Sequence, residues 1–213
     1  MITKDMLFDC YQQLLQEYGE GVRYWPQWCA KKKSPAEREK IIIGMILVQR
    51  TSWHNANLAL KNLKKTSLLS LKKIAGLKNL DHLTALCRPA GFYSVKPCRL
   101  YDLSCFILEN GGIEKLLEEK AVNLRKRLLN LKGIGPETAD TILLYALDKP
   151  VFIIDEYTRR WVVKEKLTDE KDYLKLQSFF ERNLPKDLVV YQNFHALIIV
   201  AQKGPAKSIM EIV

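Results

Sequence analysis

The fold is decided by the stretch Leu131–Arg160, which reads LKGIGPETADTILLYALDKPVFIIDEYTRR. Its first part places Gly133-Ile134-Gly135 directly before Pro136, after a helical pattern of leucines. Because proline has a fixed φ and no N–H, it suits the first position of a helix, so the sequence predicts a tight turn between two helices. The two glycines allow positive φ and close approach of a partner, and amides beside a helix start favour an anion. We expect this anion to be a nucleic-acid phosphate.

Asp155 ends the apolar run 151–154 and opens a second helical pattern, EYTRRWVVKEKL. Aspartate is a preferred N-cap residue, and the ordinary interpretation of Asp155 is a cap alone. A carboxylate at a helix start can also stabilise a cationic transition state or orient water. The nearby glycine turn favours both roles for Asp155.

Apolar residues recur at the helical period along the chain, for example over 7–18, 58–63, 100–107 and 174–180, whereas alternation at period two is nearly absent. Glycine and proline signals divide this pattern into about ten pieces. The sequence therefore predicts an all-α fold.

Composition gives 213 residues with 47% hydrophobic, enough for one core or two closely packed lobes without disulfides. The 34 Lys and Arg exceed the 24 Asp and Glu, and the net charge of +10 is typical of proteins that bind nucleic acid or acidic membranes. No apolar run approaches the roughly 20 residues of a spanning helix, and MITKDMLFDC lacks the features of a secretory signal. We expect a cytoplasmic protein without membrane association.

Three motifs together resemble the helix-hairpin-helix (HhH-GPD) DNA glycosylases, in the endonuclease III branch. Upstream, IIIGMILVQRTSW (Ile41–Trp53) is similar to the first signature helix of the family, and GFYSVKPCRL (Gly91–Leu100) to a second element. The resemblance covers roughly residues 22–200. The hairpin pattern is carried by Leu131, Gly133, Ile134, Gly135, Ala139, Asp140, Pro150 and Asp155.

The resemblance implies a two-lobed fold: a six-helix lobe over 30–149 that includes the hairpin, and a second helical lobe from 1–29 and 150–213. The active site would lie in the cleft between them. The partner implied is double-stranded DNA with a damaged base, bound by a monomer.

Many relatives hold an iron-sulfur cluster with four cysteines just after the position of His195. In this chain no cysteine follows Cys105, so we expect no cluster and interpret the cysteines as reduced thiols. The only cofactor that the resemblance implies is a structural Na⁺ or K⁺ at the hairpin carbonyls of Leu129, Leu131 and Ile134. His195 itself lies in the apolar run FHALIIV and is interpreted as a core histidine.

Cleavage of an N-glycosidic bond develops positive charge on the sugar, so the resemblance assigns catalysis to Asp155. Relatives that also cut the strand use a lysine two residues after the second hairpin glycine to form a Schiff base. Glu137 occupies that position, and Lys132 precedes the turn. We therefore expect a monofunctional enzyme with no AP lyase activity.

Such chemistry suits a base that is already positively charged, such as 3-methyladenine. An aromatic face can stack on a flipped cationic base, although aromatic clusters more often pack between helices. In the 3-methyladenine-excising relatives, which this chain resembles most, a tryptophan-proline segment at the matching place lines the base pocket. The resemblance therefore implies a base pocket at Tyr24, Trp25 and Pro26. Glu39 stands where 3-methyladenine-excising relatives can carry an aromatic residue. Gln49 is the predicted wedge that fills the gap left by the flipped base. The predicted phosphate contacts are Lys132, Gly133, Ile134, Gly135, Thr138 and Lys207.

Two alternatives remain open. One is an endonuclease III-like glycosylase for oxidised pyrimidines or mismatches. The other is a non-catalytic helix-hairpin-helix module that grips the DNA backbone only, for which a carboxylate at Asp155 would have no use.

Overall fold

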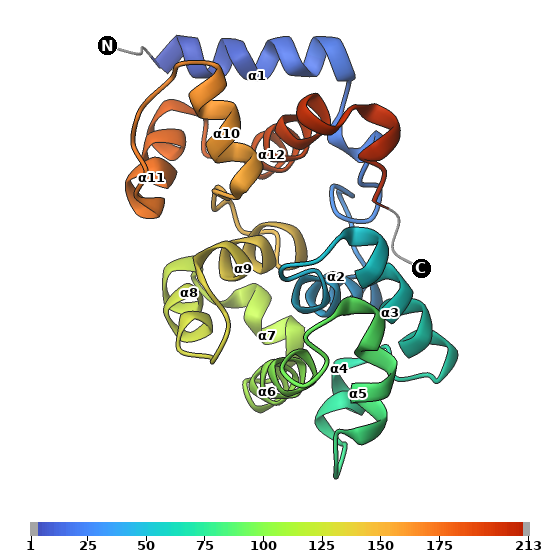
Figure 1. The fold of residues 1–213 in the computed structure, drawn as a ribbon. Helices are drawn as coiled ribbons and strands as arrows, with labels where there is room; N and C mark the ends of the chain where they lie inside the picture. Colours follow the sequence, from blue (N-terminus) through green and yellow to red (C-terminus); the bar gives the residue numbers. More distant parts are fainter. Residues whose placement is uncertain (1–3, 211–213) are drawn as a thin grey trace. The chain divides into compact units, whose positions relative to one another are not determined.

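The computed structural model describes residues 4–210, and these residues form helices and connecting turns with no strand (Figure 1). This confirms the all-α prediction. No helix within 4–210 is long and apolar enough to cross a membrane. The α-helices are α1 (Lys4–Tyr18), α2 (Pro35–Leu47), α3 (Trp53–Lys65), α4 (Leu71–Ala75), α5 (Asp81–Cys87), α6 (Lys96–Glu109), α7 (Gly112–Glu118), α8 (Ala121–Leu129), α9 (Pro136–Thr141), α10 (Glu156–Lys164), α11 (Tyr173–Asn183) and α12 (Leu188–Lys203).

Short turns of 3-10 helix join these elements at η1 (Gly21–Arg23), η2 (Arg88–Ala90) and η4 (Pro205–Lys207). A π-helical turn, η3 (Ile142–Ala146), continues directly from α9. Wide turns of this kind are frequent at functional sites.

Among the described residues the chain forms two compact units, one from 4–31 together with 143–210, and one from 32–142. The sequence placed the second boundary seven residues later, after Lys149. Residues 143–149 join the first unit because Gln192 of α12 donates to the carbonyl of Leu144, 2.9 Å away, and Tyr145 donates to the carbonyl of Gln192.

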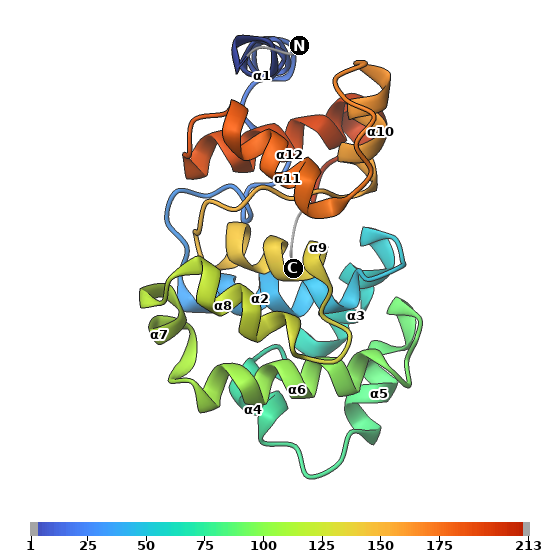
Figure 2. The same cartoon turned by 90° about the vertical axis from the view of Figure 1, so that its left-hand side faces the viewer.

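In the first unit, α12 packs against α1 and α10, and α11 packs against α1 (Figures 1 and 2). Residues 191–200 of α12 are all buried, as expected for a helix that is apolar around most of its circumference. Phe152, from the extended run before Asp155, stacks on Phe180 at 4.2 Å between ring centroids and meets Phe194 edge-on. This aromatic core fixes the segment that leads into Asp155.

In the second unit, α2 packs against α3, α6 and α9, and α6 packs against α4. Helix α2 begins with a capping box, in which Ser34 and Glu37 bond each other's backbone N–H. It ends over Lys96, whose buried ammonium donates to the carbonyls of Leu47 and Ala90, each at 2.7 Å. Burial lowers the pKa of Lys96 to about 8. The two carbonyls accept hydrogen bonds from the ammonium in place of the water that burial has removed.

The two hairpin helices, α8 and α9, are joined by an ion pair between Arg125 and Asp140. The guanidinium of Arg125 donates to both carboxylate oxygens, at 2.6 and 2.9 Å. The side chain of Asp140 is fully buried. This fork geometry fixes the distance between the helices on either side of the glycine turn.

We predict that Arg125→Met lowers the free energy of unfolding by about 3 kcal/mol, because it leaves the Asp140 carboxylate buried without its cation. Urea denaturation followed by circular dichroism measures this. Lys115→Met is the matched control, since it removes an exposed lysine from an ion pair with Glu118; equal losses in the two variants would contradict the role given to Arg125.

Candidate functional site

Asp155 is the N-cap of α10, as the sequence predicted. Its Oδ1 accepts a hydrogen bond from the backbone N–H of Thr158 at 2.7 Å. Asp172 and Asp187 cap α11 and α12 in the same way, but both are exposed. The side chain of Asp155 is only 13% exposed, so this cap carries a largely buried charge that the other two do not.

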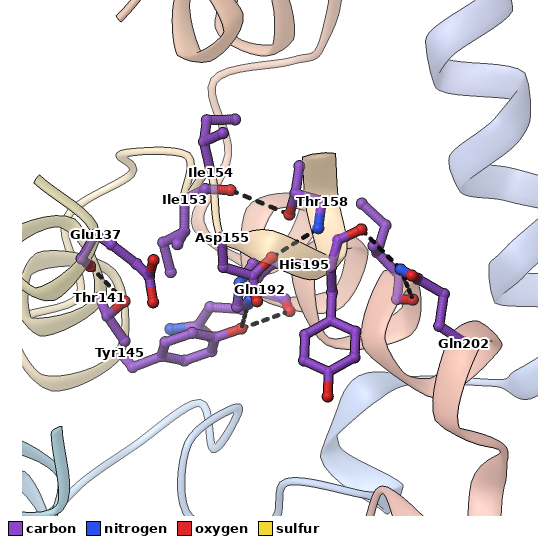
Figure 3. Close-up of polar contacts among 12 residues, drawn as sticks. Glu137, Thr141, Tyr145, Ile153, Ile154, Asp155, Thr158, Gln192, His195 and Gln202 are labelled. Carbon is purple, nitrogen blue, oxygen red and sulfur yellow. Dashed lines mark hydrogen bonds and ion pairs between the residues drawn. The ribbon is translucent and has the colours of Figure 1, made fainter. Parts of the chain in front are cut away.

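The second carboxylate oxygen of Asp155 faces a histidine (Figure 3). Its Oδ2 lies 3.6 Å from Nε2 of His195, and Nδ1 of His195 lies 2.8 Å from the hydroxyl of Tyr145. That hydroxyl also reaches the carbonyl of Gln192 at 3.2 Å. A continuous polar chain therefore runs from Asp155 through His195 and Tyr145 to the backbone of α12.

The environment of Asp155 favours the ionised carboxylate. Burial would raise its pKa, but the hydrogen bonding and charge of His195 and the N–H of Thr158 outweigh burial and hold the pKa below its usual value. By contrast, burial, together with Cys29 and Asp155, raises the pKa of Tyr145 well above 10, so Tyr145 remains a neutral hydroxyl. The sequence predicted that His195 is a core residue; it is buried, but one ring nitrogen is turned to Asp155.

The predicted base-pocket aromatics lie beside this chain. The ring of Trp25 is 5.7 Å from that of His195, edge-on, and 5.6 Å from that of Tyr145. Trp25 is 3% exposed, and its Nε1 donates to the carbonyl of Ser208. Stacking on a base therefore stays a prediction for Trp25, which in this structure packs against other rings. Tyr24 and Pro26 are partly exposed.

Residues after α12 hold this aromatic segment. Besides the bond to Ser208, the N–H of Met210 donates to the carbonyl of Tyr24 at 2.8 Å. Cys10 and Cys29 lie in the first unit and the remaining cysteines lie in the second, and no group of metal ligands forms within 4–210. The absence of an iron-sulfur cluster stays a prediction.

The hairpin turn differs from the prediction at one glycine. Gly133 has a φ of +83°, and a Cβ there would collide with the guanidinium of Arg99. Gly135 has extended backbone, with a φ of −90°, so the expectation of positive φ at both glycines is wrong for Gly135. A Cβ at Gly135 would meet open space. Glycine at this position is thus not required by the fold, which leaves close approach of an external group as its physical use.

The amides and carbonyls of the turn are used unequally. The N–H of Ile134 donates to the carbonyl of Leu131 at 3.1 Å, so this amide is already satisfied within the turn, and the Ile134 side chain is buried. Among the predicted phosphate contacts, Lys132 and Lys207 are exposed. The cation site at the carbonyls of Leu129, Leu131 and Ile134 stays a prediction.

Gln49, the predicted wedge, braces the hairpin in this structure. Its Nε2 donates to the carbonyl of Gly133 and to the hydroxyl of Thr138, each at 3.1 Å, and its Oε1 accepts from Arg99 at 2.7 Å. Thr138 is buried by this contact, with 9% of its surface exposed. Glu39 lies in α2, and burial raises the pKa of its carboxyl, although Ser70 and the backbone of Leu71 at the start of α4 act in the opposite direction. Its place in a base pocket stays a prediction.

Two exposed aromatics of the second unit were missed by the sequence reasoning. Phe92 and Tyr93 are each 52% exposed, and the guanidinium of Arg50 lies 5.6 Å from the centroid of the Phe92 ring. Both Arg50 and Phe92 have positive φ. Exposed rings held by cations are typical of surfaces that stack on nucleic-acid bases. The sequence signal that could have found this surface was Phe92, the aromatic residue directly after Gly91 in the second motif.

Two surface hollows of about 620 and 410 Å³ lie along α10 and α11 and share Thr168 and Phe179. None of the predicted site residues lines either hollow. The candidate chemistry is therefore centred on Asp155 rather than on the largest of these depressions.

Comparisons with known proteins show the family of the chain. The sequence model of the HhH-GPD superfamily base excision DNA repair proteins matches residues 43–186, more than half of the chain. The chain belongs to this family. Within the family, a Methanocaldococcus jannaschii protein whose name places it provisionally among the DNA repair glycosylases is 41% identical over 199 residues, which cover 92% of this chain and 86% of that protein.

Solved structures of the family confirm the predicted fold class. The crystal structure of an H. pylori 3-methyladenine DNA glycosylase bound to 1,N6-ethenoadenine matches with a TM-score of 0.75 and 29% identity, covering 94% of this chain and 98% of that one. A Methanocaldococcus jannaschii 8-oxoguanine glycosylase/lyase in complex with DNA matches with a TM-score of 0.68, covering 98% and 99%. At 18% identity the second likeness concerns the fold alone.

We predict a large effect on stability for alanine at Gly133 and almost none for alanine at Gly135. Gly133→Ala should lower the free energy of unfolding by about 2 kcal/mol or more, because alanine is strained at positive φ and its Cβ meets Arg99. Gly135→Ala should change it by less than about 0.5 kcal/mol. Thermal denaturation of the two variants tests this, and a large loss for Gly135→Ala would show that the fold itself requires that glycine.

Proposed function

We propose that this protein is a DNA glycosylase that hydrolyses the N-glycosidic bond of a damaged base flipped out of double-stranded DNA. The proposed base is an alkylated purine of the 3-methyladenine type, and no AP lyase step follows. The observation that carries the proposal is the ionised, largely buried carboxylate of Asp155, held by an N-cap bond and by His195 in a chain that belongs to a base excision repair family.

The carboxylate suits this chemistry because the bond breaks with positive charge on the sugar. A fixed negative charge in a low-dielectric setting stabilises that charge, provided that the carboxylate stays ionised as the site closes. The low pKa of Asp155 meets this condition. Asp172 and Asp187, which cap helices but are exposed, lack the surroundings that would make them catalytic.

Hydrolysis without strand cleavage is proposed from Glu137. This exposed residue lies in the first turn of α9, at the position where strand-cleaving relatives carry the Schiff-base lysine. A carboxylate cannot form an imine, so attack falls to water. Lys132 is an exposed lysine nearby, but it precedes the glycine turn and so does not occupy the Schiff-base position.

Binding is proposed to combine the hairpin with the positive charge of the protein. The open space above Gly135 allows a phosphate to approach the backbone, and exposed Lys132 and Lys207 supply charge. Gln49 and the exposed ring of Phe92 are proposed to contact the bases near the extruded nucleotide. Filling the gap would require Gln49 to leave its bonds to the hairpin.

The alkylated purine is favoured over other lesions by two observations. The aromatic group of Trp25, Trp28 and Tyr145 lies beside the His195 that faces Asp155, and rings of this kind favour a cationic base. The solved relative at 29% identity is a 3-methyladenine DNA glycosylase. An oxidised pyrimidine, a mismatch or 8-oxoguanine is the alternative substrate, and a non-catalytic binder is the alternative function.

We predict that Asp155→Asn lowers base release by at least about 100-fold while DNA affinity is kept, because the variant removes the charge but not the cap. The measurement is single-turnover release of base from duplexes carrying alkylated, oxidised or mismatched bases. Asp172→Asn is the matched control, since it alters an exposed cap on α11. Full activity in Asp155→Asn would show that Asp155 takes no part in the mechanism. If the unmodified protein releases no base from any of these duplexes, the proposed enzyme activity fails and a non-catalytic DNA-binding module is the remaining function.

We predict that borohydride does not trap a covalent complex between the protein and DNA that carries a substrate base. Trapping requires an imine with an amine of the protein, and Glu137 cannot supply one. Gel electrophoresis after reduction detects the adduct. The control is Glu137→Lys, which places an amine at the position in question; an adduct with the unmodified protein would overturn the monofunctional assignment.

A further inference from the structure

His195 and Tyr145 stand behind Asp155 in an arrangement that helix capping alone does not require. Two other helix-cap aspartates, Asp172 and Asp187, accept the same backbone bond from exposed positions. Around Asp155, one carboxylate oxygen is held by Thr158 and the other faces Nε2 of His195 at 3.6 Å. The rest of the imidazole is enclosed, with 4% of the residue exposed.

The second ring nitrogen determines what Nε2 presents to Asp155. Nδ1 lies 2.8 Å from the Tyr145 hydroxyl, which stays protonated because its pKa is raised well above 10. If Tyr145 donates to Nδ1, the neutral imidazole carries its proton on Nε2. If Tyr145 instead donates to the carbonyl of Gln192, 3.2 Å away, Nδ1–H donates to the phenol oxygen. The ring then carries both protons when Nε2 also donates to Asp155.

Both of these states carry a proton on Nε2, the buried nitrogen that faces Asp155 at 3.6 Å, a distance longer than a hydrogen bond. The remaining state, a neutral ring with its proton on Nδ1, would place the bare lone pair of Nε2 against the negative charge of Asp155 in a buried setting, which is unfavourable. The groups that face this ring are Asp155 from the start of α10, Tyr145 from the π-helical turn and the ring of Trp25.

We infer that His195 is a positioning residue for Asp155, that it orients this carboxylate through Nε2, and that Tyr145 holds the imidazole in place from the far side. The role rests on the proposed function of Asp155. In many active sites a third group orients a histidine that itself takes part in the reaction. Here Tyr145 would orient His195, and the reacting group would be the carboxylate of Asp155. The π-helical turn places Tyr145 there, and Gln192 anchors it to α12.

The pH dependence follows from the sign of the effect. Because the pKa of Asp155 is lowered in the folded protein, the charged form is present above that pKa and is lost as the pH falls through it. Removing the donor of His195 should therefore raise the pKa of Asp155. The acidic limb of the pH profile for base release would move toward neutral pH.

The first experiment is NMR and needs no substrate. The protein has three histidines, and His54 and His82 are exposed, so ¹⁵N signals are assigned by single substitutions. We expect His195 near neutral pH to carry a proton on Nε2, in the neutral or the doubly protonated ring. A neutral ring with its proton on Nδ1 would overturn the inference.

The second experiment follows the ¹³C signal of the Asp155 carboxyl with pH, assigned with Asp155→Asn. His195→Leu should raise the pKa of Asp155, and Tyr145→Phe should raise it less. His195→Gln restores an N–H donor and should recover part of the effect, which a role in packing alone would not give. His82→Leu is the matched control. An unchanged Asp155 pKa in folded His195→Leu would overturn the inference.

Single-turnover kinetics then separates this inference from the proposed function. We expect His195→Leu to slow base release about 10- to 100-fold with DNA affinity kept, and His195→Gln to be slowed less. If the unmodified protein releases no base, the proposed function fails, whereas the two NMR measurements still decide the pairing. Equal rates and pH profiles for His195→Leu and the unmodified protein would reject the positioning role.

Discussion

The hydrogen bond from the Thr158 amide to Asp155 is the interaction on which the candidate chemistry depends. It fixes one carboxylate oxygen at 2.7 Å and leaves the other directed at His195. Burial disfavours a charge, yet the bond and the nearby imidazole together hold the pKa of Asp155 below its usual value. The aromatic stack of Phe152 on Phe180 fixes the extended run that delivers Asp155 to the helix start. A cap that elsewhere in this chain serves only to begin a helix thereby becomes a fixed charge.

In the hairpin, too, some residues are required by the fold and others face open space. Gly133 is required by its positive φ and by Arg99 beneath it, while Gly135 faces open space in an ordinary backbone conformation. Gln49 ties the turn to α2 through the carbonyl of Gly133, and Arg125 ties α8 to α9 through Asp140. The turn is therefore held rigidly from behind, and its exposed side is left available. Rigid backbone amides bind an anion with little loss of conformational entropy.

The sequence predicted features that depend on neighbours along the chain: the helical class, Pro136 at the start of α9, the cap at Asp155 and the family itself. Features that depend on distant pairs were missed. His195 and Tyr145 are 50 residues apart, and Gln49 and Gly133 are 84 residues apart, so no local sequence pattern predicts either contact. The amide of Ile134 was assigned to a phosphate because the internal bond to Leu131 depends on turn geometry. Glu39 was judged by its position in a motif, whereas its partners lie at the start of α4.

The way in which the first unit is assembled from both ends of the chain bears on how the protein is made. Helix α1 packs against α11 and α12, and Tyr24 and Trp25 are held by Met210 and Ser208. Residues 32–142 form a compact unit from one continuous segment, and such units generally fold as they are synthesised. The segment before them has to wait until residues 143–210 have been synthesised, and closing so long a loop is slow. During translation the buried faces of α1 and of the tryptophan segment remain exposed to chaperones and to other nascent chains. The aromatic residues beside Asp155 are therefore ordered last.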